Sequence, residues 1–267
     1  MGLRINSDNP LLANNLNKSH NRIRETMERL ASGNRINQAA DDAAGLAIAE
    51  GLRAQLQGAQ VETRNMQSGI SMIQTAEGGL EQTTGALQRL RELALQASNG
   101  TLTDAQRAAI NEEAQQMVSQ INETAQNTEF NGTTLLNGTG GTVALGAGTN
   151  IEVELPNATA GGLGVSEIDL GTQAGAEAAV ANIDAALATV TEQRSGFGAT
   201  QNAIESAIRN RETETENLMA ARAAIREANI AAETTRLAQS QILEQSGMSV
   251  LAQSNIQAEN ALRLLVD

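Results

Sequence analysis

The first recurring pattern along the chain lies near its start, where large side chains return every three or four positions. Its members are Leu16, His20, Ile23, Met27 and Leu30. Because an α-helix has about 3.6 residues per turn, these side chains would form one stripe on its surface. The stripe predicts an amphipathic helix that weakens near Gly33, where turn-forming residues follow.

A much longer pattern begins after residue 50, with a hydrophobic residue at almost every seventh position. Its members are Leu52, Ala59, Met66, Ile73, Leu80, Leu87 and Ala94. A sustained heptad repeat is typical of a coiled-coil-like helix. This helix would extend roughly 60 Å. The stretch ASNGTLT then predicts its end at an Asn-Gly stop.

Shorter elements are predicted in the middle of the chain. Thr103 and Gln106 match a capping box ahead of a helical stripe that reaches Ile121. Residues 141–155 alternate apolar and polar side chains around a Gly-rich turn. This alternation predicts a β-hairpin, within a β and loop region at about 133–175.

Two further helical stripes close the chain, from Ala176 to Ile225 and from Leu237 to Leu265. The order of elements is therefore nearly palindromic. Helices of this length cannot fold into a ball, so we expect the chain to run out, turn at the β element and run back. The predicted fold is mainly α: a long coiled-coil-like bundle with a small β-hairpin at its tip and paired N- and C-terminal helices.

Composition narrows the possible functions of the 267 residues. Aromatic residues are 1% of the chain, which suits thin helix seams better than a deep core. The net charge of −13 disfavours a nucleic-acid surface. No cysteine is available for a disulfide, a zinc site or a thiol nucleophile. No apolar run is long enough to span a membrane, and the N-terminus has no secretory signal pattern.

Two places could carry chemistry, and in both a structural role is favoured. Asp41 and Asp42 are adjacent, so on a helix they would point about 100° apart. Paired catalytic carboxylates must instead converge across a cleft, and we interpret the two acids as a helix cap at a junction. His20 is expected at a helix seam or interface, because it has no triad or metal partners. No catalytic, cofactor or metal site is predicted, and the chain is not expected to be an enzyme.

The two chain ends are the strongest candidates for an interaction surface. Each terminal helix would have only one short neighbour within the chain, and small helix pairs are marginal in water. We therefore expect the ends to become ordered when many copies pack together. The hydrophobic positions predicted for this contact are Ile5, Leu12, Leu16, Ile23, Leu30, Met248, Leu251, Leu262 and Leu265.

Five stretches are distinctive enough to compare with known families. They are LASGNRINQAADDAAGLAIAEGLRAQLQG, NMQSGISMIQTAEGGLEQTTGALQRLRELALQASNGT, INETAQNTEFNGTTLL, RSGFGATQNAIESAI and ILEQSGMSVLAQSN. They resemble the signatures of the bacterial flagellins, the filament subunits of the flagellum. The resemblance covers nearly the whole chain and implies a structural subunit that self-assembles into a helical filament for motility. A hook–filament junction protein of the flagellum is the alternative.

The resemblance also implies a domain organisation. The inner domain would comprise residues 1–42 plus 228–267, and the helical-bundle domain residues 43–227. Asp41 and Asp42 would lie at the junction between these domains. Only about 35 residues, 141–175, stand where most flagellins carry a variable outer insertion. The chain therefore resembles a minimal flagellin.

Partners and location follow from the same resemblance. It implies self-association, a flagellar export chaperone on the C-terminal segment, and filament cap and hook-associated proteins. The chain would be secreted through the flagellar export channel and reside in the extracellular flagellum. Some flagellins are detected by a Toll-like innate immune receptor through an LQRxRELA motif and an acid on the next helix. These features map onto Arg89, Leu93 and Glu113.

Overall fold

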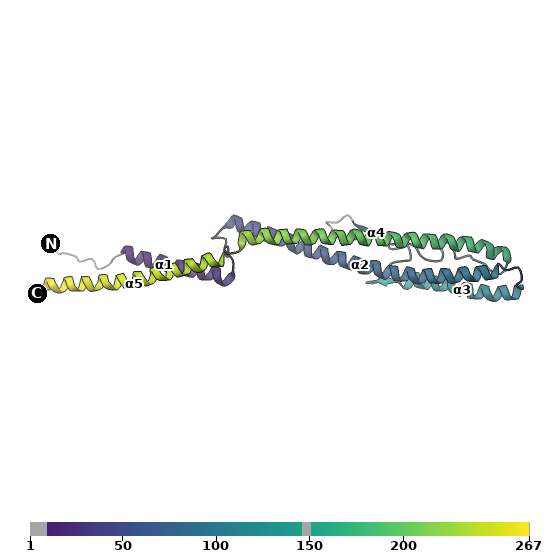
Figure 1. The fold of residues 1–267 in the computed structure, drawn as a ribbon, viewed down its shortest axis with the longest axis horizontal. Coiled ribbons are helices and arrows are strands. Elements are labelled where there is room, and N and C mark those ends of the chain that lie inside the picture. The colour runs from purple at the N-terminus through teal and green to yellow at the C-terminus, as the bar shows by residue number, and fades with distance from the viewer. Residues whose placement is uncertain (1–9, 146–150, 267) are drawn as a thin grey trace. The chain divides into compact units, whose positions relative to one another are not determined.

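The computed structural model describes the backbone of residues 10–145 and 151–266, with all side chains except those at 10–12, 258, 259 and 261–266. Long helices dominate these residues, as predicted (Figure 1). The elements are α1 (Pro10–Ser32), α2 (Ala43–Ala97), α3 (Asp104–Asn127), β1 (Glu129–Phe130), β2 (Thr133–Thr134), β3 (Thr142–Ala144), β4 (Glu152–Glu154), α4 (Gln173–Arg226) and α5 (Ile230–Val266).

The chain divides into two compact units. The terminal unit contains residues 1–56 and 216–267, and the bundle unit contains residues 57–215. The helices α2 and α4 each contribute to both units. The predicted domain limits, 1–42 plus 228–267 and 43–227, lie at the start of α2 and just after the end of α4, whereas the unit boundaries lie within these helices. The domain limits stay a prediction.

The bundle unit is organised around the heptad positions of α2. These side chains are buried, as predicted: Ala59, Met66, Ile73, Leu80, Leu87 and Ala94. All of these except Ala59 belong to one hydrophobic core with buried positions of α3 and α4 and with the loops before α4. Leu52, the first heptad position, is half-buried. Dispersion forces and apolar burial along this thin seam stabilise the bundle unit, in place of the thick aromatic core that stabilises an ordinary globular domain.

Ion pairs show that α2 and α4 run antiparallel within the bundle unit. Arg91 Nε lies 2.6 Å from Asp184 Oδ1, and Arg211 Nη2 lies 2.8 Å from Glu62 Oε2. The partner on α4 therefore moves back along the chain as the partner on α2 moves forward. The hydrogen bond that Arg91 donates to Asp184 raises the pKa of Arg91 above its usual value. These exposed or half-exposed pairs set register more than stability.

Two small antiparallel strand pairs complete the bundle unit. The predicted hairpin is present as β3 paired with β4, with Val143 opposite Val153. The other pair, β1 with β2, was not predicted as strands. Its connection is Asn131-Gly132, and both residues have positive φ, 52° and 77°. This is the conformation that an Asn-Gly type I′ hairpin turn requires.

Polar groups close both helix ends at the α2–α3 connection. The predicted capping box is present, with the Thr103 hydroxyl accepting from the Gln106 N–H. Arg107 in the first turn of α3 folds back into the end of α2. Its guanidinium donates to three carbonyls, Ala97 O (3.1 Å), Leu102 O (2.6 Å) and Asn99 O (3.3 Å). This buried arginine therefore satisfies carbonyls that the end of a helix leaves without partners.

Candidate self-assembly surface

The helices α1 and α5 pack side by side in the terminal unit (Figure 1). On α1, the side chains that α5 covers are Ser19, Ile23 and Thr26, with Leu16 and Leu30 half-buried at the same face. The hydroxyl of Ser19 donates to the carbonyl of Ser240 at 2.9 Å. Small hydroxyl residues therefore let the two helices approach closely and still satisfy their polar atoms.

This face differs from the predicted stripe at two positions. His20, which was expected at a seam or an interface, and Met27, another member of the stripe, are both exposed. A helical face accepts steps of either three or four residues, and the hydrophobic pattern did not distinguish them. His20 lies at the edge of the seam, where its Nδ1 is 3.3 Å from Glu244 Oε1 on α5.

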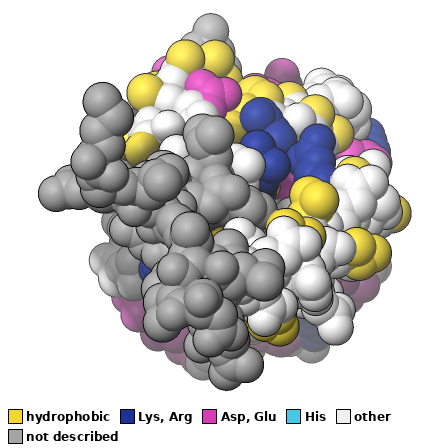
Figure 2. All heavy atoms as spheres, turned by 90° about the vertical axis from the view of Figure 1, so that its left-hand side faces the viewer, with side chains coloured by type: hydrophobic (Ala, Val, Ile, Leu, Met, Phe, Trp, Pro, Cys, Tyr) yellow, Lys and Arg dark blue, Asp and Glu magenta, His cyan; other side chains and the backbone are white. Residues whose placement is uncertain are grey.

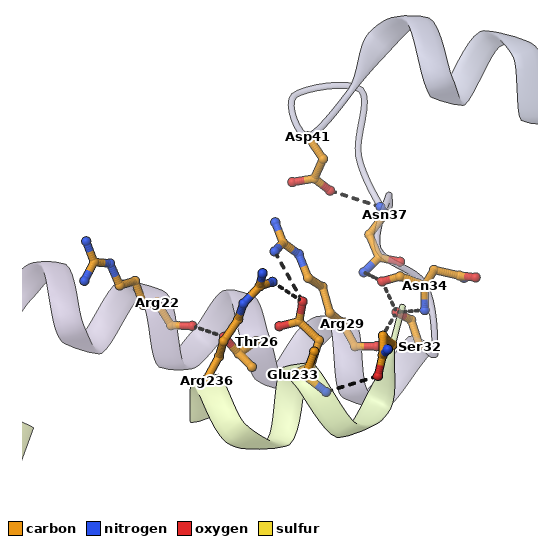
Figure 3. Close-up of polar contacts among 11 residues, drawn as sticks. Arg22, Thr26, Arg29, Ser32, Asn34, Asn37, Asp41, Glu233 and Arg236 are labelled. Atoms are coloured by element: carbon orange, nitrogen blue, oxygen red, sulfur yellow. Dashed lines mark hydrogen bonds and ion pairs between the residues drawn. The ribbon is translucent and has the colours of Figure 1, made fainter. Parts of the chain in front are cut away.

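The base of the helix pair is held by charge around Glu233 (Figure 3). Glu233 is almost fully buried in the first turn of α5, 2.7 Å from Arg236 and 3.9 Å from Arg29 of α1. A carboxylate also suits the positive end of the helix dipole. Asn229 caps α5 through its side chain, which accepts from the Ala232 N–H at 3.1 Å. No hydrophobic pattern could have revealed this group.

Backbone pairing ties the segment after α1 to the end of α4, within the terminal unit. Asn34 and Glu227 form an antiparallel bridge. The N–H of Arg35 donates to Arg226 O at 2.6 Å, and the N–H of Ala228 donates to Gly33 O at 2.9 Å. Gly33 adopts a positive φ of 70°, which permits this turn. The chain ends are therefore joined by hydrogen bonds as well as by helix packing.

The two acids at residues 41 and 42 have structural roles. Asp42 caps α2, because its Oδ1 accepts from the Gly45 N–H at 2.8 Å. Asp41 Oδ2 accepts from the N–H groups of Asn37 and Gln38, each at 3.0 Å, and Figure 3 shows the bond to Asn37. These hydrogen bonds lower the pKa of Asp41. The placement of both acids at a domain junction stays a prediction.

The terminal helix pair leaves many hydrophobic side chains open to solvent. They are Met27, Ile230, Ile242, Leu243, Met248, Val250 and Ile256. Figure 2 shows hydrophobic side chains at the surface beside a group of Lys and Arg side chains. Six of these seven residues belong to α5, so the helix that α1 covers on one side is hydrophobic on other sides too. Hydrophobic side chains on several sides of one helix are typical of a helix with more than one protein neighbour.

The nine predicted assembly residues fall into four groups. Ile23 is buried against α5, whereas Leu16, Leu30 and Leu251 are half-buried. Met248 is 51% exposed and available to a partner. The others lie outside the described side chains: Ile5, Leu12, Leu262 and Leu265.

The three residues suggested for receptor recognition lie in the bundle unit. Arg89 and Glu113 are partly exposed and paired, with Arg89 Nη2 2.7 Å from Glu113 Oε1. Glu113, with help from Glu92, raises the pKa of Arg89 above its usual value. Leu93 is 1% exposed and belongs to the core. The structure thus brings the charged pair to the surface and leaves the leucine beneath it.

The chain shows no sign of a metal centre or a membrane span where it is described. Among the side chains that the structure describes, His, Asp and Glu nowhere gather in a group of three that could hold a metal ion. No helix within residues 10–145 and 151–266 is long and apolar enough to cross a bilayer.

Comparisons with known proteins agree along most of the chain. The bacterial flagellin N-terminal helical region matches residues 6–140, and the C-terminal helical region matches residues 180–265. A flagellin of Halalkalibacterium halodurans is 42% identical in an alignment of 257 positions that covers 94% of this chain and 94% of that protein. The flagellar filament 30.7 kDa core protein of Treponema maltophilum is 36% identical, over 92% of this chain and 93% of that protein.

A solved structure extends the agreement to the fold. The crystal structure of Bacillus cereus flagellin superposes with a TM-score of 0.51 at 25% identity. The superposition covers 55% of this chain and 88% of that one.

Proposed function

Because the chain belongs to the bacterial flagellin family, we propose that its α1–α5 helix pair is the surface through which copies assemble. The chain is a structural subunit of the bacterial flagellar filament. The hook–filament junction alternative is not favoured, since the relatives that match most of its length are filament proteins. The family is one of structural proteins.

One observation carries the assignment of the assembly surface to α5. Ile242 is 64% exposed, although it is only two residues from the buried Ser240 that faces α1. Two residues correspond to about 200° around a helix, so Ile242 points away from α1. Fully burying one such side chain contributes about 1.5–3 kcal/mol. Several such positions per subunit, repeated along a polymer, supply the free energy for assembly.

Point variants test this surface without removing the helix. We expect Ile242→Gln combined with Val250→Gln to raise the critical concentration for polymerisation, measured by sedimentation after seeding. Leu95→Gln is the matched control, because Leu95 is 49% exposed but lies on α2 in the bundle unit. Normal filaments from the double variant would refute the proposed surface.

Truncation gives a coarser test of the same mechanism. A chain without residues 228–267 should remain a helical monomer by circular dichroism and should form no filaments under negative-stain electron microscopy. If this truncated chain polymerised normally, the terminal helices would not drive assembly.

Before assembly, the exposed hydrophobic side chains of α5 create a need for protection, because exposed apolar surface is an aggregation risk for a single copy. We therefore propose that a flagellar export chaperone binds the C-terminal segment and that the chain leaves the cell through the flagellar export channel. The filament cap and hook-associated proteins are the proposed partners at the filament ends. Loss of the chain from the extracellular fraction on deleting residues 230–266 would support this route, whereas unchanged export would contradict it.

Host recognition is a second candidate function, supported by the exposed Arg89–Glu113 pair. We expect Arg89→Ala to reduce activation of a Toll-like receptor in a reporter cell line. Arg194→Ala is the control, since Arg194 is also partly exposed and ion-paired but lies on α4, outside the LQRxRELA motif. Equal signals from the wild type and from Arg89→Ala would exclude this role for the pair.

A further inference from the structure

The methionine side chains differ sharply in exposure between the two units. Three methionines of the terminal unit are about half exposed: Met27 (48%), Met219 (50%) and Met248 (51%). The methionines of the bundle unit pack in or against its core: Met66, Met72 and Met117. Oxidation of a thioether requires that the oxidant reach the sulfur, so susceptibility follows exposure. Among the described residues, the readily oxidisable methionines therefore belong to the terminal unit.

Met27 and Met248 lie on one flank of the α1–α5 helix pair. His20 and Glu244, with 3.3 Å between Nδ1 and Oε1, join the two helices at this edge of their contact. Met27 follows His20 by seven residues, and Met248 follows Glu244 by four. Both spacings return to within about 40° of the same side of a helix. The flank therefore carries one exposed thioether from each helix, whereas Met219 belongs to α4.

The same flank has the properties of a contact between copies. Ile230 lies 18 residues before Met248, which is five helical turns, so the two side chains share one side of α5. Ile230 is 49% exposed, and the flank thus presents three large hydrophobic side chains to solvent. An unbranched thioether adapts well to an apolar contact. A second copy that packed on this flank would bury both sulfur atoms.

We propose that Met27 and Met248 form a peroxide-sensitive modification site that controls assembly of the subunit. The inference rests on the proposed function of the α1–α5 pair as the assembly surface. A lone pair of the sulfur attacks one oxygen of hydrogen peroxide and the O–O bond breaks. The thioether becomes a sulfoxide, and the peroxide is reduced to water after one proton passes to the departing hydroxide.

The product no longer suits the contact between copies. A sulfoxide is polar, and burying its oxygen without a hydrogen-bond donor carries a free-energy cost that the thioether does not have. An oxidised free subunit is therefore excluded from the polymer. In an assembled filament the neighbouring copy covers the sulfur atoms and protects them from the oxidant.

Seeded polymerisation of peroxide-treated monomer tests the site. Critical concentrations would be measured before and after hydrogen peroxide treatment for the wild type, the Met27→Leu/Met248→Leu double variant and Met219→Leu. Leucine keeps the apolar volume and removes the sulfur. We expect oxidation to raise the critical concentration of the wild type and of Met219→Leu about tenfold, and that of the double variant less than about threefold. Met219→Leu is the matched control, because Met219 is equally exposed but lies outside the helix pair.

Peptide mass spectrometry locates the added oxygen atoms. In treated monomer we expect sulfoxide at Met27, Met219 and Met248, whereas the buried Met66 and Met72 are internal controls that stay reduced. In treated filaments, Met27 and Met248 should be protected. Methionine sulfoxide reductases for both epimers should restore assembly of the oxidised monomer, which separates this modification from irreversible damage.

Several results would overturn the proposed site. They are normal assembly of the oxidised wild type, equal impairment of the oxidised double variant, and oxidation of Met27 and Met248 as fast in filaments as in monomer. Poor assembly of the untreated double variant would also overturn it, because the contact would then need more than apolar volume at these positions. Failure of the untreated wild type to polymerise would instead refute the assembly function on which the site rests.

Discussion

Replacing Arg107 with methionine should destabilise the bundle unit by removing the group that closes the end of α2. The side chain of Arg107 is only 7% exposed, and it donates to Ala97 O, Asn99 O and Leu102 O. Methionine retains the apolar stem of arginine and loses all three hydrogen bonds. Ala97 O and Leu102 O then lose the guanidinium as their side-chain donor, and Asn99 O keeps only the N–H of Leu102.

The size of the effect can be worked out from these contacts. Hydrogen bonds to charged groups contribute about 1.5–3 kcal/mol each, which sets an upper range of roughly 4.5–9 kcal/mol for three. Methionine avoids the cost of burying a cation, and Asn99 O also accepts from the Leu102 N–H at 3.2 Å. We therefore expect a net loss of about 2–3 kcal/mol. For a unit of this size, that corresponds to a fall in Tm of roughly 4–12 °C.

The assay is thermal and urea unfolding of the monomer, followed by far-UV circular dichroism. Arg107→Lys is an informative companion, because one ammonium group cannot span three carbonyls as the planar guanidinium does. Its stability should fall between those of the wild type and Arg107→Met. If Arg107→Met unfolded within about 0.5 kcal/mol of the wild type, the buried arginine would not be closing the helix as we reason.

Three further predictions concern the terminal unit. Gly45→Ala should lower the free energy of unfolding by about 1–3 kcal/mol in urea titrations, because a Cβ would lie 2.8 Å from Ile36 Cδ1. Backbone N–H groups lower the pKa of Asp41, so its stabilising contribution is present above the usual pKa of about 3.9 and is lost as pH falls through the folded value. The Tm difference between the wild type and Asp41→Asn should thus be largest near neutral pH and vanish in acid; a constant difference would contradict this. Amide exchange at residues 230–256 should slow strongly on polymerisation, and equal protection in monomer and filament would argue against α5 as the assembly surface.

The hydrophobic pattern alone determined most of the fold. Heptad spacing placed Met66, Ile73 and Leu80 on one buried face of α2, and the structure confirms their burial. The Thr103–Gln106 capping box and the β3–β4 hairpin were likewise readable, because caps and alternating strands depend on neighbours only a few residues apart. Local signals of this kind do not need the rest of the chain.

Only the tertiary structure decided which polar side chains the molecule buries. Ser19 faces Ser240, and Glu233 meets Arg29, across more than 200 positions of sequence. Arg107 is buried for the same kind of reason, because the carbonyls that it satisfies become available only where α2 ends beside α3. The role of a buried polar residue depends on the partner that it meets in the folded chain. The burial of a hydrophobic residue, in contrast, can be predicted from its spacing in the sequence. The hydrophobic spacing in the sequence therefore predicts the long helices. Which polar side chains cap the helix ends and pair with one another depends on which segments meet in the folded chain.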